Sequence, residues 1–209
     1  MGFYEPHAVP RRMHIADGYS DLEPGKIANV VTCLQMFERP APRPDPPGID
    51  CELVRAKAPA LHWYRELFRR IGEPYLWASR LAMSDDELAA TILDPQVEVY
   101  AVQRGLDEIG MLELDFRIER ECELKFVGLA TDVVAKGIGR WLMNRALDLA
   151  WSHPIGRFWV HTCTIDHPSA VSYYVRSGFT PYKRQIEVLD DPRVIGLLPR
   201  TAAPDIPIL

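Results

Sequence analysis

The sequence lacks both a basic excess and long apolar runs. Its 24 lysines and arginines are outnumbered by 29 aspartates and glutamates, which gives a net charge of −5. Such a chain has no general attraction for a phosphate backbone or an anionic membrane. The amino terminus has no apolar run of signal-peptide length, and no later run is long enough for a membrane-spanning helix. We therefore expect a cytoplasmic protein whose partners include neither nucleic acid nor a membrane.

Cysteine is also scarce and shows no metal or disulfide pattern. The four cysteines form no C-x-x-C pair; they are Cys33, Cys51, Cys122 and Cys163. In a chain of this size such spacing favours reduced thiols. His161, Cys163 and His167 lie close together, but zinc requires four ligands and no spaced cysteines or histidines complete the set. The sequence predicts a buried thiol at Cys163, no disulfide framework and no metal.

The remaining composition is that of an ordinary globular protein. Hydrophobic residues make up 47% and charged residues 25% of the 209 positions. Prolines and glycines interrupt residues 1–26, and four prolines interrupt residues 190–209. Both termini are therefore expected to be irregular, the first as a leader and the second as a tail over the surface. We expect residues 27–189 to form a single domain.

The first half of this domain begins with a strand and continues with helices. An apolar, β-branched run predicts a buried strand over 27–37, and five prolines in residues 39–48 predict a loop after it. A 3.6-residue apolar period predicts a helix over 59–71. Ser84 and Glu87 form the capping-box pattern of a second helix, which Pro95 ends.

The second half begins with a change to a two-residue period. This period predicts three antiparallel strands, at 97–104, 108–118 and 122–131. The later segments are predicted as a helix at 141–151, a strand at 157–165, a helix at 167–179 and a strand at 182–189. Strands and helices in this order indicate an α/β (α+β) domain.

A glycine loop lies between a strand and a helix at Lys136-Gly137-Ile138-Gly139. Glycine lets an anion approach the free amides of a helix terminus, and the helix dipole favours negative charge there. Lys136 and Arg140 add positive charge, although a tight turn also requires glycine for steric reasons alone. Neither nucleotide loop fits, because Leu142 replaces the third glycine of a Rossmann loop and the P-loop Gly-Lys-Ser/Thr is absent.

Two motifs resemble those of the GNAT N-acetyltransferase superfamily. Residues 134–139 are similar to its acetyl-CoA motif Q/R-x-x-G-x-G/A, with Val134 in place of Gln or Arg. Residues 167–179 reproduce the spacing of its later helix, A-x-x-L-Y-x-x-x-G-F, and His167-Pro168 stands where the family has a pair such as Asn-Pro. One helix and one strand separate the motifs, as in the family. The resemblance covers residues 97–189.

The resemblance implies the GNAT fold, with a mixed, mostly antiparallel central sheet that is flanked by helices and splayed at the acetyl-CoA cleft. It implies acetyl-CoA as co-substrate and an amine of a small molecule or peptide as acceptor, and it leaves a homodimer open. The residues that it places at the cofactor, mainly through their main chain, are Leu129, Ala130, Thr131, Ala135, Lys136, Gly137, Ile138, Gly139, Arg140 and His167. A non-catalytic acyl-CoA sensor or scaffold is the alternative function.

For catalysis the resemblance indicates a tyrosine and a glutamate. Tyr174 falls on the tyrosine that acts as general acid toward the departing thiolate, and its neighbour Tyr173 is expected to turn inward as packing. Glu123 stands where histone-acetylating relatives carry their base, if an apolar cleft raises its pKa, and Glu113 on the neighbouring strand competes for this role. Four early aromatic residues either shape the acceptor pocket or fill the core: Trp63, Tyr64, Tyr75 and Trp77.

Overall fold

A computed structural model describes residues 17–133 and 137–209 of the chain. The described elements are β1 (Lys26–Met36), β2 (Glu52–Ala56), α1 (Leu61–Gly72), α2 (Asp85–Ile92), β3 (Val97–Arg104), β4 (Asp107–Asp115), β5 (Glu121–Leu129), α3 (Ile138–Ala150), β6 (Arg157–Cys163), α4 (Ala170–Arg176) and β7 (Thr180–Asp190). Short 3-10 turns lie at Glu73–Tyr75 and Thr131–Val133. None of the helices in these ranges is long and apolar enough to cross a membrane.

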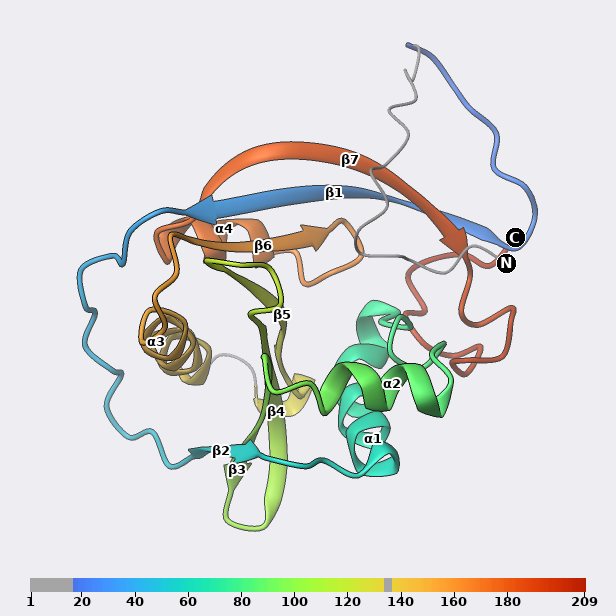
Figure 1. The fold of residues 1–209 in the computed structure, drawn as a ribbon. Helices are drawn as coiled ribbons and strands as arrows, with labels where there is room; N and C mark the ends of the chain where they lie inside the picture. The colour runs from blue at the N-terminus through green and yellow to red at the C-terminus, as the bar shows by residue number, and fades with distance from the viewer. Residues whose placement is uncertain (1–16, 134–136) are drawn as a thin grey trace.

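The sheet is mixed and opens between two of its strands. The described strands lie in the order β2-β3-β4-β5-β6-β1-β7, with β5 and β6 parallel and the other neighbours antiparallel. The parallel pairing ends at Glu123 and Trp159. Beyond this point β5 stays with β4 as far as Leu129, while β6 stays with β1 as far as Cys163. The strands diverge, as predicted, into an opening that we call the split (Figure 1).

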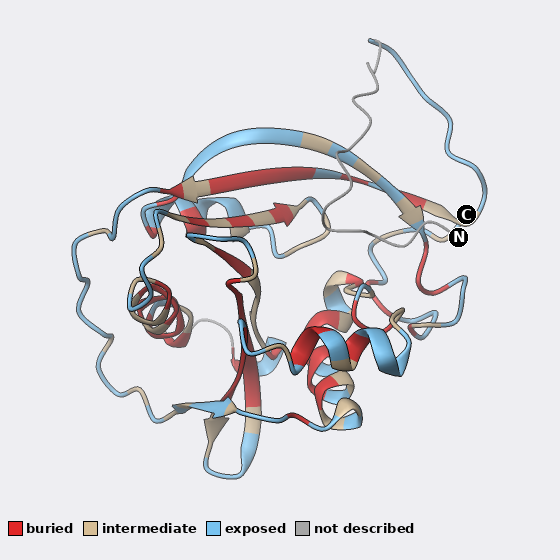
Figure 2. Cartoon of the chain, in the orientation of Figure 1, coloured by how far each residue is buried: buried red, intermediate tan, exposed pale blue. Residues whose placement is uncertain are grey.

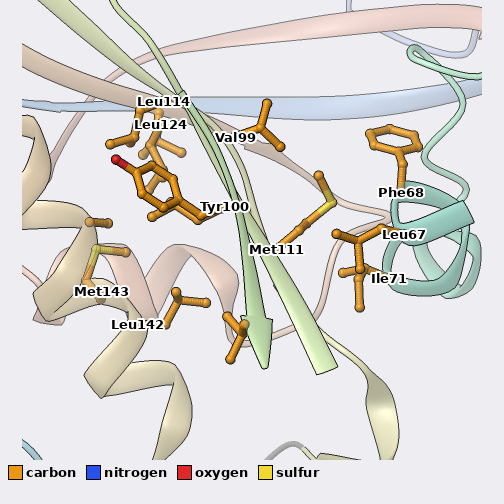
Figure 3. Packing of buried hydrophobic residues seen from close by; sticks show 14 of the residues in the cluster. Leu67, Phe68, Ile71, Val99, Tyr100, Met111, Leu114, Leu124, Leu142 and Met143 are labelled. Carbon is orange, nitrogen blue, oxygen red and sulfur yellow. The ribbon is translucent and has the colours of Figure 1, made fainter. Parts of the chain in front are cut away.

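Helices cover both faces of the strands β3 to β5. In Figure 1, α3 lies on one side of these strands, and α1 and α2 lie on the other. Figure 3 shows the packing side chains: Leu67, Phe68 and Ile71 from α1 lie near Met111, and Leu142 and Met143 from α3 lie on the side of Tyr100, Leu114 and Leu124. Burying each side chain of this size stabilises the fold by roughly 1.5–3 kcal/mol. The buried positions concentrate in these strands and on the inner sides of the helices (Figure 2).

The helix α2 is specified by its own sequence. The backbone amide of Glu87 donates to Ser84 Oγ (3.3 Å), and the amide of Ser84 donates to the Glu87 carboxylate (2.8 Å). This is the predicted capping box, which satisfies two amides that the helix leaves without a carbonyl. The helix begins at Asp85, and its start is therefore fixed locally.

The amino-terminal half contains one strand that the sequence analysis did not predict. β1 is present, but it pairs with β6 and β7 at the end of the sheet away from β3. A short strand, β2, pairs with β3 instead, and the sequence analysis missed it. Its five residues are mostly exposed, so they carry little of the apolar alternation from which strands are recognised.

The connection between β1 and β2, residues 37–51, wraps around the outside of α3, and we call it the strap (Figure 1). Asp45 accepts a hydrogen bond from Asn144 Nδ2 (2.7 Å) and lies 2.9 Å from the guanidinium of Arg145. Arg43 donates to the carbonyl of Arg176 at the end of α4 (2.8 Å). The strap therefore fastens α3 and α4 to each other from outside.

The carboxyl-terminal tail packs into the fold and does not merely lie over its surface. Arg193 is 3% exposed and forms an ion pair with Asp191 at 2.7 Å. Its guanidinium also donates to three tail carbonyls, those of Ala202, Ala203 and Ile206. Because one buried arginine satisfies these carbonyls, an irregular segment can bury its apolar side chains, here Leu198, Ala202 and Ala203.

Candidate active site

The split leaves one edge of β5 open. Beyond Glu123, no described strand pairs with the edge of β5 that faces β6. Backbone amides and carbonyls on an open edge need partners, so an extended ligand can bind there. Among the predicted cofactor residues, Leu129 ends β5, Thr131 is exposed, and the amide of Ala130 already donates to the carbonyl of Ile109 (2.9 Å).

The helix α3 starts beside the end of this edge. Gly137 is its N-cap and has φ = 81°, in the left-handed region that favours glycine. Ile138 is buried and anchors the first turn, whereas Arg140 is exposed. The first amides of a helix have no carbonyl partner within it, which makes this terminus suited to a phosphate group. Two predicted cofactor residues, Ala135 and Lys136, lie outside the described residues.

The two glycines of the loop differ in the space around them. A Cβ atom at Gly137 would lie 2.8 Å from Pro46 of the strap, which is too close for a real contact. A Cβ at Gly139 would lie 3.9 Å from the ring of Tyr173, which is an ordinary contact. Gly137 is therefore needed for packing against the strap, whereas a side chain at Gly139 can be added without displacing the chain.

The two adjacent tyrosines of α4 differ in burial and in their partners. Tyr174 is buried and packs edge-on against Phe179. Tyr173 is half-buried, and its hydroxyl donates to the carbonyl of Gly139 in the first turn of α3 (2.7 Å). Burial raises the pKa of Tyr174 well above its ordinary value, and the charge of Asp166 raises it further. The Tyr174 phenol is therefore protonated throughout the neutral range.

Aromatic side chains from the segment after α1 reach across the split. Trp77 packs against Gly128 of β5, where a Cβ would lie 3.2 Å from its ring, and its indole N–H donates to Asp166 after β6 (2.9 Å). Tyr75 packs edge-on against His167, with ring centroids 6.4 Å apart. His167 Nδ1 accepts the amide of Ser169 (3.2 Å), which is the capping role that competes with a cofactor contact. The segment after α1 therefore contacts both arms of the split.

Glu123 lies at the point where the split begins. It is 7% exposed, and its carboxylate contacts Lys125 Nζ (3.1 Å) and His161 Nδ1 (3.1 Å). Burial alone would raise the pKa of the Glu123 carboxyl, but the hydrogen bond from His161 and the charge of Lys125 hold it below its ordinary value. The condition on which the sequence analysis made Glu123 a base, a pKa raised by an apolar cleft, is not met, because the two partners outweigh the burial. Glu123 is therefore ionised at neutral pH.

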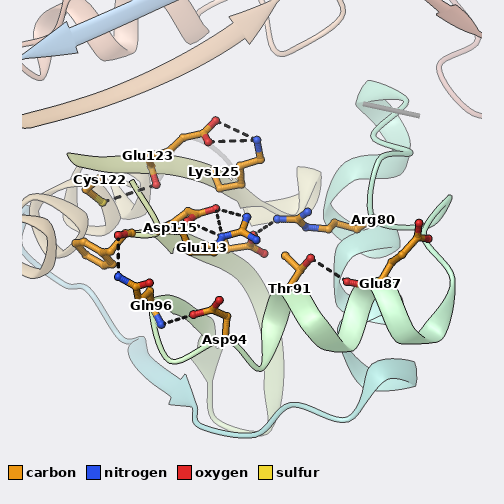
Figure 4. A network of polar contacts seen from close by, with 12 residues as sticks. Arg80, Glu87, Thr91, Asp94, Gln96, Glu113, Asp115, Cys122, Glu123 and Lys125 are labelled. Atoms are coloured by element: carbon orange, nitrogen blue, oxygen red, sulfur yellow. Dashed lines mark hydrogen bonds and ion pairs between the residues drawn. The ribbon is translucent and has the colours of Figure 1, made fainter. Parts of the chain in front are cut away.

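Glu113 lies on the same face of the sheet in a separate buried cluster (Figure 4). Its carboxylate is fully buried and accepts from the guanidinium of Arg80 and the hydroxyl of Tyr64. Arg80 also lies over the ring of Phe126, 5.3 Å from its centroid. This arrangement connects the segment before α2 to β4 and β5, and both oxygens of Glu113 are engaged within it.

Thiol and metal chemistry receive no support in the described parts of the chain. Burial raises the pKa of the Cys163 thiol to about 11, which leaves it protonated at neutral pH and a poor nucleophile. Residues 17–133 and 137–209 contain no cluster of histidine, cysteine, aspartate and glutamate side chains that could hold a metal ion.

Several site residues were missed from the sequence. Asp166 binds Trp77, Thr162 Oγ1 and the amide of Cys163, and Arg80 binds Glu113. In the sequence, the spacing of His161, Cys163 and His167 suggests only metal or thiol chemistry and does not point to Asp166. His161 follows the end of the β5–β6 pairing by two residues. The sequence alone does not show that β5 is its neighbour, so it could not identify His161 as a site residue.

The fold and the glycine-capped helix are those that the GNAT resemblance predicted. The chain belongs to the acetyltransferase (GNAT) family, whose family model matches residues 55–179, more than half of the chain. A search of curated proteins gives no match.

Solved structures agree on the fold. A functionally unknown conserved protein from Staphylococcus epidermidis is 12% identical with a TM-score of 0.59, covering 80% of this chain and 63% of its own. A putative GNAT acetyltransferase from Novosphingobium aromaticivorans is 17% identical with a TM-score of 0.52, covering 81% and 70%. The PaiA N-acetyltransferase from Thermoplasma acidophilum, solved with coenzyme A, is 18% identical with a TM-score of 0.50, covering 68% and 99%. This chain thus spans less than two thirds of the Staphylococcus protein.

Proposed function

We propose that the protein transfers the acetyl group of acetyl-CoA to an amine of a small molecule or peptide by direct attack. The observation that carries the proposal is the split itself, which exposes the edge of β5 between the glycine-capped start of α3 and the ionised Glu123. An acyl donor on the α3 side and an amine on the α1 side would meet at this opening.

The described residues fit the cofactor. Gly137 and Gly139 keep side chains away from the start of α3, where free amides and the helix dipole favour a pyrophosphate. The open edge of β5 offers backbone groups to the pantetheine arm. The related fold of PaiA was solved with coenzyme A, which supports the same cofactor here. When bound, acetyl-CoA supplies an activated acetyl thioester.

Two side chains divide the proton transfers in this proposal. Tyr174 holds the proton that the departing thiolate needs, and its burial keeps that proton in place until transfer. Glu123 supplies the negative charge on the acceptor side, where the amine must lose a proton to react. Glu113 is excluded from the role of base in this proposal because Arg80 and Tyr64 occupy its carboxylate.

The test is release of free thiol from acetyl-CoA with a panel of acceptors: a polyamine, an aromatic amine, an aminoglycoside and short peptides. Acetylation of any amine, with the amide product verified by mass spectrometry, supports the enzyme. Binding of CoA without turnover on any acceptor would instead favour the alternative, an acyl-CoA sensor or scaffold. Longer acyl-CoAs in the same assay establish the preference for the acyl chain.

A further inference from the structure

We propose that His161 takes the proton from the acceptor amine and that Glu123 is a positioning residue that acts through it. This inference deepens the proposed function and rests on it. The pair is formed by a strand on each arm of the split, β5 and β6, and neither motif of the family contains His161.

The first argument is position. His161 lies two residues beyond Trp159, at which the parallel pairing with β5 ends, so it stands at the start of the diverging arm of β6. Its Nδ1 lies 3.1 Å from the carboxylate of Glu123. The His161 side chain is 32% exposed and that of Glu123 is 9% exposed. A reactant in the split can therefore reach the imidazole, while the carboxylate is buried behind it.

The second argument is the chemistry of the two groups. A carboxylate that accepts Nδ1–H leaves the lone pair on Nε2, and it stabilises the imidazolium that forms when Nε2 gains a proton. Glu123 engages Nδ1 of His161, so Nε2 is the ring nitrogen left for a ligand. Glu123 is less suited to be the base, because His161 and Lys125 already hold its oxygens and lower its proton affinity.

Charged and titratable groups face His161 from several strands. Glu123 and Lys125 face it from β5, Cys33 stands opposite it on β1, and Lys183 of β7 stands opposite Cys33. Asp115 of β4 pairs with Glu123 in the register and is held by Arg117. One carboxylate, that of Glu123, contacts the imidazole, and the ammonium of Lys125 shares this carboxylate.

The proton balance is complete with these residues. The amine nitrogen attacks the thioester carbonyl, a C–N bond forms, and the C–S bond breaks. The acceptor enters as an ammonium ion and gives one proton to His161 Nε2 before attack, and the imidazolium passes this proton to solvent. The nitrogen loses a second proton as the C–S bond breaks, and the Tyr174 hydroxyl gives one proton to the thiolate. Solvent carries the second proton back to the phenolate. The net products are the amide, the free thiol of CoA and one proton.

The kinetic test is His161→Asn. Asparagine keeps a donor near the position of Nδ1 but has no group at Nε2. With the best acceptor of the panel we expect kcat to fall about 100-fold near neutral pH, with the affinity for CoA unchanged. The deficit should shrink at higher pH, where the amine loses its proton to solvent. Exposed His62 on α1 gives the matched control, His62→Asn, which should behave as wild type.

A spectroscopic test reads the pair without turnover. Long-range ¹H–¹⁵N spectra of the neutral imidazole should show the Nδ1–H tautomer at His161 in wild type. Glu123→Gln should shift the population toward Nε2–H, because the neutral amide loses the charge that selects the tautomer. Glu123→Gln should also reduce kcat, by less than His161→Asn does.

The outcomes separate the two proposals. A wild type that acetylates no amine contradicts the proposed function, and the catalytic role of His161 with it. An active wild type with a His161→Asn variant of unchanged kcat and pH profile contradicts His161 alone. A wild-type Nε2–H tautomer that Glu123→Gln leaves unaltered contradicts the positioning role of Glu123.

Discussion

On the α3 side of the split, the groups offered to the cofactor belong mainly to the backbone: the open edge of β5, the first turn of α3 and the glycines 137 and 139. On the α1 side, the groups are polar side chains: Glu123 with His161 and Lys125, and Glu113 with Arg80. The first side is specified by residues adjacent in sequence. The second is specified by pairs of residues from distant elements.

This difference has a physical reason. A phosphate is recognised by amides at one helix terminus, so a short segment with glycines in the right places suffices. The acceptor amine must be deprotonated by a side chain of suitable proton affinity, and that affinity depends on the charges beside the side chain. The cofactor side should therefore respond to changes in backbone space, and the acceptor side to changes in charge.

The largest expected effect is on the charged side, from Arg80→Ala. The change leaves the buried carboxylate of Glu113 without its cation, and breaking such a pair costs about 3–5 kcal/mol in the free energy of unfolding. Urea unfolding measures the loss. The control is Arg104→Ala, whose partner Asp50 is exposed and whose loss should cost less than about 1 kcal/mol. Equal losses in the two variants would show that burial of the charges is irrelevant.

Tyr174→Phe and Tyr173→Phe compare chemistry with anchoring on the α3 side. Tyr174→Phe should lower kcat about 100-fold, since the thiolate loses its proton donor, and should leave CoA affinity unchanged. Tyr173→Phe removes the bond to the Gly139 carbonyl and should lower stability by about 1 kcal/mol with a small effect on kcat. Steady-state kinetics and CoA titration separate them, and a fully active Tyr174→Phe variant would refute the general acid.

Asp191→Asn tests a buried charge pair remote from the split. Bonds from Arg193 lower the pKa of Asp191, so the native state binds fewer protons than the unfolded state. The resulting stability is present above about pH 4, the ordinary carboxyl value, and is lost as pH falls through the lower folded pKa. Asp191→Asn should cost roughly 1.5–3 kcal/mol near neutral pH. Urea midpoints should converge in acid, and a pH-independent difference would contradict the charge pair.

The smallest effect should come from the strap. Asp45→Ala removes the contacts with Asn144 and Arg145 on α3, and partly exposed contacts of this kind are worth about 1 kcal/mol or less. We expect a slightly lower melting temperature and nearly unchanged turnover. A large loss of CoA affinity would show that the strap shapes the cofactor side directly.

The parts of the fold that sequence reasoning recovered were those with local patterns. The capping box of Ser84 and Glu87 and the two-residue periods of β3 to β5 each describe a single element. The place of β1 between β6 and β7 has no local signal, because strand order depends on which edges meet in the folded sheet. The exposed strand β2 was missed for want of apolar alternation.

In the candidate site, too, sequence reasoning recovered the features with a local pattern and missed those without one. The motifs located the start of α3 and the tyrosines of α4, but not which tyrosine is the more buried. A base at Glu123 required an apolar cleft that raises its pKa, but His161 and Lys125 lower this pKa instead. Its partner His161 lies on another strand, and no spacing in the sequence shows that the two meet.

The most direct test of the central claim is thermal unfolding with CoA in three proteins. Binding to the native state alone stabilises it, by about 2.7 kcal/mol at one hundred times the dissociation constant. Wild type should show a higher melting temperature with CoA, and Gly139→Glu should lose this increase, because its carboxylate would occupy the anion site. The fold has room for a side chain at position 139, so the variant should still fold. Gly156→Glu, before β6, adds the same side chain with comparable room and should keep the shift. No wild-type shift at millimolar CoA, or an equal shift in Gly139→Glu, would contradict a cofactor site at the start of α3.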